Sequence, residues 1–158
     1  MRKGFILSAA LIASVAITAL FAAAENVIDY SKTPEYLFIL TADTGTFKDG
    51  KLTLNGTPIV AFYALGEKRD DGHFFSEEFV KMWDTKAVIL KADPPNGTIN
   101  ILDDKGYYSA VMQFSEPKAD INTITFKARV LEGDIPASFN STSMFLRLKL
   151  TSPIHTQN

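Results

Sequence analysis

The residues that could do chemistry gather in one short stretch around a glycine. This stretch contains an arginine, a histidine and several carboxylates: Arg69, Asp70, Asp71, His73, Glu77 and Glu78. An arginine can hold a carboxylate or another anion through two parallel hydrogen bonds, and a histidine can titrate near neutral pH or bind a metal. We therefore predict a candidate ligand-binding site made of Arg69, His73, Asp70 and Glu77, in a loop from Glu67 to His73 and the helix start behind it. We favour the interpretation in which Arg69 pairs with the neighbouring carboxylates and His73 satisfies the loop backbone, which leaves a rigid surface structure.

The same stretch does not match a known metal-binding or catalytic pattern. His73 and the nearby carboxylates could supply ligands for calcium or zinc, but their spacing fits neither an EF-hand loop nor a His-Glu-x-x-His helix. A serine hydrolase would need a histidine base, which here could only be His73, and the sequence has no G-x-S-x-G motif. We predict no catalytic residue, no metal and no cofactor. A small secreted hydrolase or metal-dependent enzyme centred on Arg69, His73 and Glu77 is the alternative.

Composition narrows the class of protein further. The chain has 158 residues, of which 46% are hydrophobic and 22% charged, with 16 basic and 18 acidic side chains and no cysteine. These values are typical of one globular domain and exclude collagen-like, disulfide-rich and strongly disordered chains. Nucleic-acid binding depends on clustered Lys and Arg, which this acidic chain lacks, so no nucleic-acid partner is predicted.

The first 24 residues have the pattern of a secretory signal peptide. Arg2 and Lys3 precede an apolar run, and Ala22-Ala23-Ala24 ends it before Glu25. A basic start, an apolar centre and a small-residue cleavage site are the parts of such a peptide. Because the apolar run from Phe5 to Ala24 is near the length that a bilayer requires, a permanent anchor is the alternative. The small residues at its end favour cleavage near Ala24, which leaves no stable membrane anchor and a secreted or periplasmic protein.

Residues 25–158 are expected to form one all-β domain. Short apolar or alternating runs are separated by turn residues at intervals of about ten residues, which is typical of a sandwich or barrel. We predict a mostly antiparallel, immunoglobulin-like β-sandwich of about eight strands. The strands are expected near Glu35–Ala42, Lys51–Leu54, Ile59–Leu65, Ala87–Ala92, Thr98–Leu102, Tyr107–Phe114, Asn122–Leu131 and Ser143–Leu150. Asn55-Gly56 lies between two apolar runs, so the stretch from Lys51 to Tyr63 is the best candidate for a hairpin.

One segment departs from this pattern and predicts a short helix. From Ser76 to Asp84 a good N-cap residue precedes two carboxylates, and Phe79 and Trp83 are four residues apart. An N-cap serine and acidic residues in the first turn favour a helix start, and residues four apart lie on the same helix face. We expect this face to pack over one end or edge of the sheet.

Several of these segments together resemble a family of small secreted bacterial proteins of unknown function. The resemblance rests on Arg69-Asp70-Asp71-Gly72-His73, on Ser76–Val80 with Trp83, on Asp93-Pro94-Pro95-Asn96, on Ser115-Glu116-Pro117 and on Val130–Gly133. It implies export and a shared fold, and it implies no mechanism. The sequence departs from the family pattern at Tyr63–Glu67, where members carry an aromatic-Ser-x-Arg-Pro segment.

Taken together, these features predict an exported, non-catalytic binding or interaction module. Its predicted partner is a protein or a small anionic or sugar ligand, and the chain is expected to be a monomer or a weak dimer. A third alternative is a structural subunit that offers a sheet edge to a partner by strand addition.

Overall fold

The computed structural model describes residues 33–66, 69–150 and 154. Their elements follow the chain in the order β1 (Glu35–Lys48), β2 (Lys51–Asn55), β3 (Ile59–Leu65), β4 (Asp71–Phe75), α1 (Ser76–Thr85), α2 (Ala87–Ala92), β5 (Asn96–Asp103), β6 (Gly106–Asp120), β7 (Thr123–Gly133) and β8 (Ser138–Lys149). The predicted signal peptide and the predicted cleavage point near Ala24 lie outside the described residues.

All eight strands belong to one antiparallel sheet, in the order β2-β7-β6-β5-β8-β1-β3-β4. The sheet closes on itself because β2 also pairs with β1, so that six strands form a ring and β3 and β4 extend from it. Strand β1 makes this possible by changing partner along its length. Its first half, up to Leu40, pairs with β3, and its second half, from Thr44, pairs with β2.

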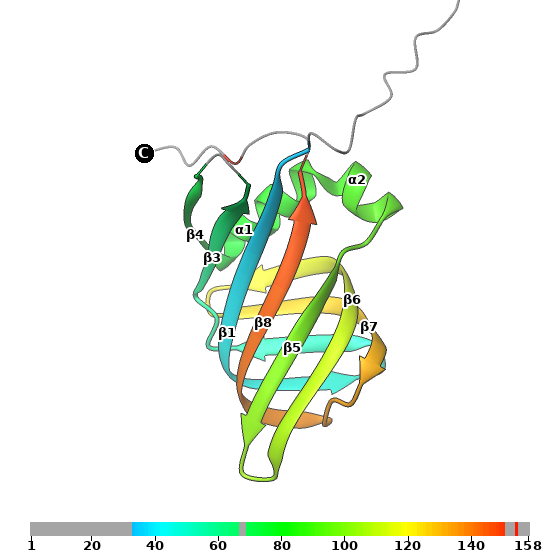
Figure 1. Ribbon diagram of the computed structural model, residues 1–158. Helices are drawn as coiled ribbons and strands as arrows, with labels where there is room; N and C mark the ends of the chain where they lie inside the picture. Colours follow the sequence, from blue (N-terminus) through cyan, green and yellow to red (C-terminus); the bar gives the residue numbers. More distant parts are fainter. Residues whose placement is uncertain (1–32, 67–68, 151–153, 155–158) are drawn as a thin grey trace, which may run out of the picture.

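The structure differs from the predicted immunoglobulin-like sandwich, which would have two separate sheets, because all eight strands belong to one sheet that closes on itself. In Figure 1 the strands β1, β8 and β5 and the first part of β6 run along the long axis, while β2, β7 and the rest of β6 cross behind them at a steep angle. The predicted mostly antiparallel all-β fold with about eight strands and a short helix is confirmed. Its two layers are opposite walls of a single sheet.

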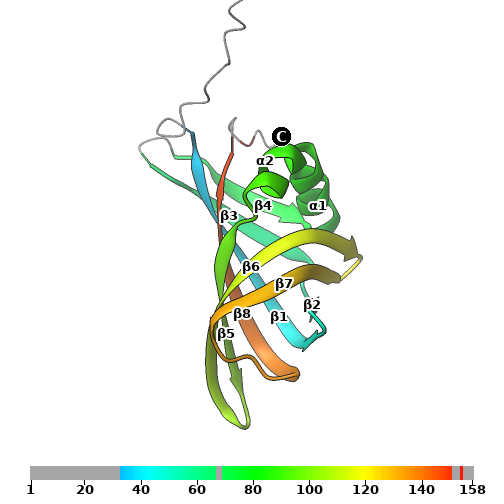
Figure 2. The ribbon, with the colours of Figure 1, turned by 90° about the vertical axis from the view of Figure 1, so that its right-hand side faces the viewer.

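The core fills the space between these walls and is rich in aromatic rings. Phe38, Phe79, Phe114 and Phe126 are all buried. The rings of Phe38 and Phe79 have centroids 5.5 Å apart, as do those of Phe114 and Phe126. Helix α1 brings Phe79 and Trp83 into this cluster, and both helices lie at one end of the molecule (Figure 2). The predicted packing of this helix over one end of the sheet is therefore confirmed.

The predicted strand at Ala87–Ala92 is wrong, because these residues form α2. The run Ala-Val-Ile-Leu-Lys-Ala is apolar and short, and such a run cannot be assigned to strand or helix by periodicity alone. Here it directly follows α1, from which only Lys86 separates it, and Pro94 and Pro95 follow it before β5 begins.

The predicted hairpin between Lys51 and Tyr63 is also wrong, since β2 and β3 do not pair with each other. The hairpin lies one turn earlier, where Lys48 pairs with Lys51 around Asp49-Gly50. Both turn residues have positive φ, 50° at Asp49 and 74° at Gly50. A two-residue turn with two positive φ values matches the twist of the flanking strands, and Asp-Gly favours it.

Candidate functional site

Of the four predicted site residues, His73 lies on strand β4, in a stretch that was expected to be a loop. Asp71 and His73 lie on β4 and pair with Tyr63 and Ala61 of β3. Both β4 side chains are exposed on the solvent side of the sheet, as is Phe75, whose ring meets that of His73 edge-on with centroids 6.2 Å apart. The predicted loop therefore ends at Asp70, and beyond it the chain is an extended strand.

Asp70 is tied to the interior of the protein. The hydroxyl of Tyr36 donates a hydrogen bond of 2.8 Å to the Asp70 carboxylate and accepts one of 3.1 Å from the Ile154 N–H. Burial raises the pKa of Tyr36 above its ordinary value of 10.0, and the bond and the negative charge of Asp70 raise it further, while the Ile154 bond lowers it. Tyr36 thus joins Asp70, the residue just before β4, to Ile154, and the role of Asp70 is structural.

Helix α1 starts directly after β4, with a different cap from the one predicted. Phe75 is the N-cap, and its N–H donates a hydrogen bond of 2.9 Å to the carboxylate of Glu78. Ser76 is the first helical residue, and its buried hydroxyl donates to the carbonyl of Thr57. Glu77 lies exposed in the first turn, where a carboxylate interacts favourably with the helix dipole.

The structure does not join the predicted site residues into one cluster. Arg69, His73 and Glu77 are all exposed, and no hydrogen bond or ion pair connects them within the described part of the chain. In those same residues, no group of three or more His, Cys, Asp or Glu side chains is placed to hold a metal ion. None of the helices described there has the length and apolar character needed to cross a bilayer.

A more prominent feature of this region is a set of apolar side chains on the solvent side of the sheet. We call it the outer patch, and it spans β4, β3, β1 and β8. Its most exposed members are Phe75 and Tyr63, at 59% and 50% of full exposure. The outer patch consists of Leu37, Ile39, Ile59, Tyr63, Leu65, Phe75 and Phe145.

Strand pairing makes the outer patch contiguous. Ile59 is opposite Phe75, Leu37 is opposite Tyr63, and Ile39 has Phe145 as its neighbour on the other side. Directly opposite residues on one face of an antiparallel pair have adjacent side chains. Soluble proteins seldom expose contiguous apolar patches of more than a few hundred Å², and larger ones mark interaction sites.

The outer patch borders the free edge of the sheet. Strand β4 is at the end of the strand order, and no strand among the described residues pairs with its other side. In Figure 1 it forms the left-hand margin of the sheet. The other terminal strand in the order, β2, has no such edge because it also pairs with β1.

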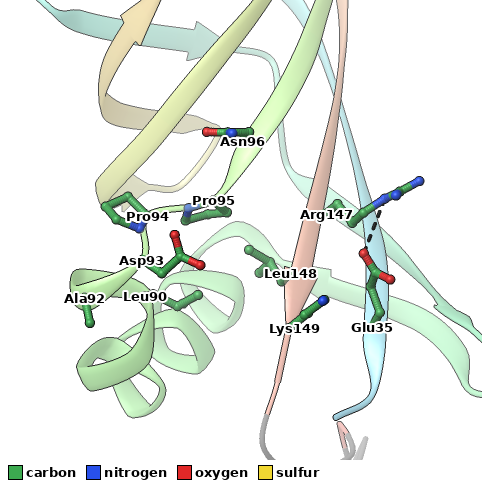
Figure 3. A pocket seen from close by; sticks show the side chains of 10 residues that line it. All are labelled: Glu35, Leu90, Ala92, Asp93, Pro94, Pro95, Asn96, Arg147, Leu148 and Lys149. Atoms are coloured by element: carbon green, nitrogen blue, oxygen red, sulfur yellow. Dashed lines mark ion pairs between the residues drawn. The ribbon is translucent and has the colours of Figure 1, made fainter. Parts of the chain in front are cut away.

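A hollow of about 340 Å³ lies between the end of α2 and β8 (Figure 3). Its rim carries charges of both signs, from Glu35, Asp93, Arg147 and Lys149, and it includes the Asp93–Asn96 turn. The guanidinium of Arg147 is already paired with Glu35 at 3.5 Å. Because the charges oppose one another, the hollow does not select an anion or a cation by charge.

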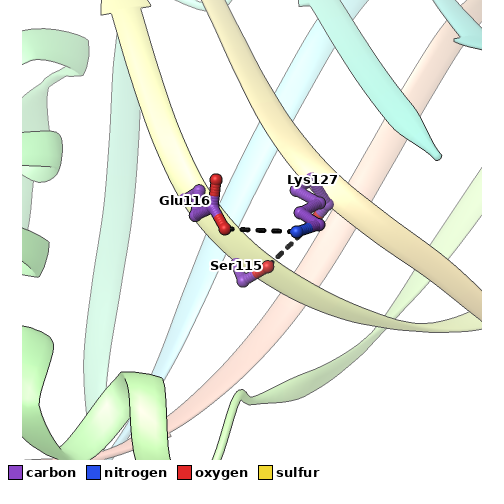
Figure 4. Close-up of polar contacts among 3 residues, drawn as sticks. All are labelled: Ser115, Glu116 and Lys127. Carbon is purple, nitrogen blue, oxygen red and sulfur yellow. Dashed lines mark hydrogen bonds and ion pairs between the residues drawn. The ribbon is translucent and has the colours of Figure 1, made fainter.

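The Ser115-Glu116-Pro117 segment forms an irregularity in β6. The register between β6 and β7 shifts between Ser115 and Lys118, and Glu116 has a φ of 50°. Its carboxylate lies 3.4 Å from the ammonium group of Lys127, as Figure 4 shows. Both side chains are mostly exposed, so this pair contributes little to stability.

Sequence reasoning concentrated on the polar residues of this region and missed the outer patch. The signal for it was present in β3, where Ile-Val-Ala-Phe-Tyr-Ala-Leu has no polar residue on either face. A half-buried antiparallel strand alternates apolar and polar residues. An unbroken apolar run therefore indicates either burial on both faces or an exposed apolar face.

Comparison of the chain with protein-family models, with curated proteins and with solved structures gave no match.

Proposed function

We propose that this chain is an exported, non-catalytic interaction module that binds a protein partner through the outer patch and the adjoining edge of β4. The observation that carries this proposal is the contiguity of the outer patch across four neighbouring strands, next to the one sheet edge that the described residues leave unpaired. Export is proposed from residues 1–24, whose pattern is that of a signal peptide.

A protein partner fits this surface better than a small ligand does. Protein-binding sites have an apolar centre with a polar rim. The outer patch has aromatic side chains in Tyr63, Phe75 and Phe145, and charged residues border it at Asp71, Glu35 and Arg147. A small ligand is usually bound in a concave site that buries most of its surface, whereas the outer patch lies on the face of a sheet.

The proposal can be tested by selecting partners from a library of random linear peptides displayed on phage, with the processed protein as the target. Peptides that bind the wild type should bind Tyr63→Lys at least about tenfold more weakly, the effect of losing about 1.4 kcal/mol of contact energy. Ile121→Lys is the matched control, because Ile121 is an exposed apolar residue in the turn between β6 and β7, outside the outer patch.

Two results would contradict the proposal. One is that the wild type enriches no peptide beyond the level of the Tyr63→Lys variant. The other is that the enriched peptides lose as much affinity for Ile121→Lys as for Tyr63→Lys, because the outer patch would then have no special role.

A further inference from the structure

The free edge of β4 exposes main-chain groups at two residues. The N–H of Ala64 donates to the carbonyl of Asp70 at 2.7 Å, and the N–H of Ser76 donates to the carbonyl of Pro58 at 3.1 Å. Hydrogen-bonded positions alternate along an antiparallel pair. The N–H and C=O groups of the intervening residues Asp71 and His73 therefore point away from β3, toward solvent.

The next outward N–H, that of Phe75, is already used. It donates to the carboxylate of Glu78 at 2.9 Å. A strand added at this edge thus finds four main-chain groups on Asp71 and His73, two donors and two acceptors, that hold no hydrogen bond to any described residue. An edge with so few main-chain donors and acceptors fits a partner strand that also presents only a few.

We infer that the partner at this edge is a second copy of the chain, whose β4 pairs antiparallel with the first around a twofold axis at Gly72. This arrangement places Asp71 of each copy opposite His73 of the other. It uses all four free main-chain groups of each copy and leaves the bond between Phe75 and Glu78 intact. The inference rests on the proposed function, since it names the partner for part of the same surface.

The side chains and the Phe75 N–H favour this register over the two registers that are shifted along β4. Opposite-charge cross-strand pairs are favourable, and like charges directly opposite are unfavourable. In the proposed register an imidazole N–H can donate to a carboxylate, twice in the dimer. A shift toward the start of β4 would place the two Asp71 carboxylates opposite each other. A shift toward its end would require the Phe75 N–H that Glu78 holds.

The position of Gly72 also fits the axis. In the proposed dimer the two Gly72 residues would form a non-hydrogen-bonded pair, the position at which Cα atoms of neighbouring strands come closest, at about 4.5 Å. Glycine has no side chain to oppose that approach. The pairing would also join the two outer patches into one face, with Phe75 of both copies near the seam.

Sedimentation velocity over a range of protein concentrations tests the inference. We expect the processed wild type to form a weak, concentration-dependent dimer, because the pairing uses the main-chain groups of only two residues in each copy. His73→Pro should raise the dissociation constant at least about tenfold, since proline has no N–H to donate. Proline is tolerated where the N–H faces away from the sheet, so the variant should keep the wild-type circular dichroism spectrum.

A charge exchange tests the register without proline. Asp71→Arg should weaken the dimer, and the double change Asp71→Arg with His73→Asp should restore it to within about threefold of wild type, because each pair then joins a guanidinium to a carboxylate. Asp104→Arg, at an exposed site in the turn between β5 and β6, is the control for the change in net charge and should leave the dimer unchanged.

The outcomes separate this inference from the proposed function. A wild type that stays monomeric at all concentrations overturns the dimer, while the peptide selection still decides the role of the outer patch. A dimer that Tyr63→Lys dissociates and His73→Pro leaves intact overturns pairing through β4 and supports the outer patch as the contact. A double variant that remains as weak as Asp71→Arg overturns the register.

Discussion

At the scale of single residues, Tyr36 connects three segments that lie far apart along the chain. Its hydroxyl is both donor and acceptor, to the Asp70 carboxylate and from the Ile154 N–H. The ring itself is buried. A buried polar group that loses its partner costs free energy, so this hydroxyl stabilises the positions of Asp70 and Ile154 together.

Tyr36→Phe should lower the free energy of unfolding by about 1 to 3 kcal/mol, because it leaves the buried Ile154 N–H without an acceptor. Urea titration at pH 7 measures this. The variant should also change the response to alkali. Since burial raises the pKa of Tyr36 in the folded state, the wild type loses stability as the pH rises above about 10, and Tyr36→Phe lacks this contribution. Parallel losses in the two proteins would contradict the prediction.

Thr57 and Thr142 form a natural comparison, since both are buried threonines. The Thr57 hydroxyl has no hydrogen-bond partner among the described residues, whereas that of Thr142 donates to the carbonyl of Asn100 at 2.8 Å. Thr57→Val should therefore leave the free energy of unfolding unchanged or raise it. Thr142→Val should lower it by about 1 kcal/mol. Urea titration of the two variants side by side measures the difference, and equal losses would contradict the prediction.

At the scale of elements, α1 closes one end of the core with two aromatic side chains. The ring of Trp83 lies 5.8 Å from that of Phe79 and 6.1 Å from that of Phe126 on β7, between centroids. Only 3% of Trp83 is exposed. The helix therefore depends on this contact, since a helix of ten residues is marginal without tertiary packing.

Trp83→Ala should lower the free energy of unfolding by about 3 to 5 kcal/mol, the usual effect of truncating a buried aromatic residue. Lys81→Ala, on the exposed side of the same helix, is the control and should change it by less than about 0.5 kcal/mol. Chemical unfolding followed by circular dichroism measures both. A loss below about 1 kcal/mol for Trp83→Ala would show that the helix contributes little to the core.

The elements also show where prediction from the sequence succeeded. The strands with clear alternation, such as β7, and the helix α1 were predicted at their observed places. Local pattern was not enough for β4, because Asp71-Gly72-His73 has the composition of a turn. Its strand conformation comes from pairing with β3, a tertiary effect that overrides propensity.

Dependence on strand pairing also explains why the candidate site was predicted only in part. The sequence identified Asp71 and His73 as residues that could do chemistry, but whether they converge with Arg69 and Glu77 depends on strand pairing that local pattern does not specify. The outer patch was missed for a similar reason. Its members come from four strands, and only the register brings Leu37, Tyr63 and Phe145 onto one face.

At the scale of the whole molecule, the proposed export predicts a shorter protein outside the cell. Intact-mass measurement of the protein recovered from the secreted or periplasmic fraction should give a chain that begins at Glu25. Ala22→Lys together with Ala24→Lys should block this processing, because the cleavage site requires small residues. A full-length chain retained in the membrane would instead show that the apolar run is an anchor.

The neighbouring positions of β1 and β8 have a consequence for when this protein can fold. Eleven residue pairs join these two strands, from Glu35 with Lys149 to Thr46 with Ser138, and β8 also links β1 to β5. The ring thus stays open until the last strand has left the ribosome. Folding is slow when contacts join distant parts of a sequence. If the proposed export holds and the chain crosses a membrane unfolded, this delay would keep it translocation-competent until β8 pairs with β1 and β5.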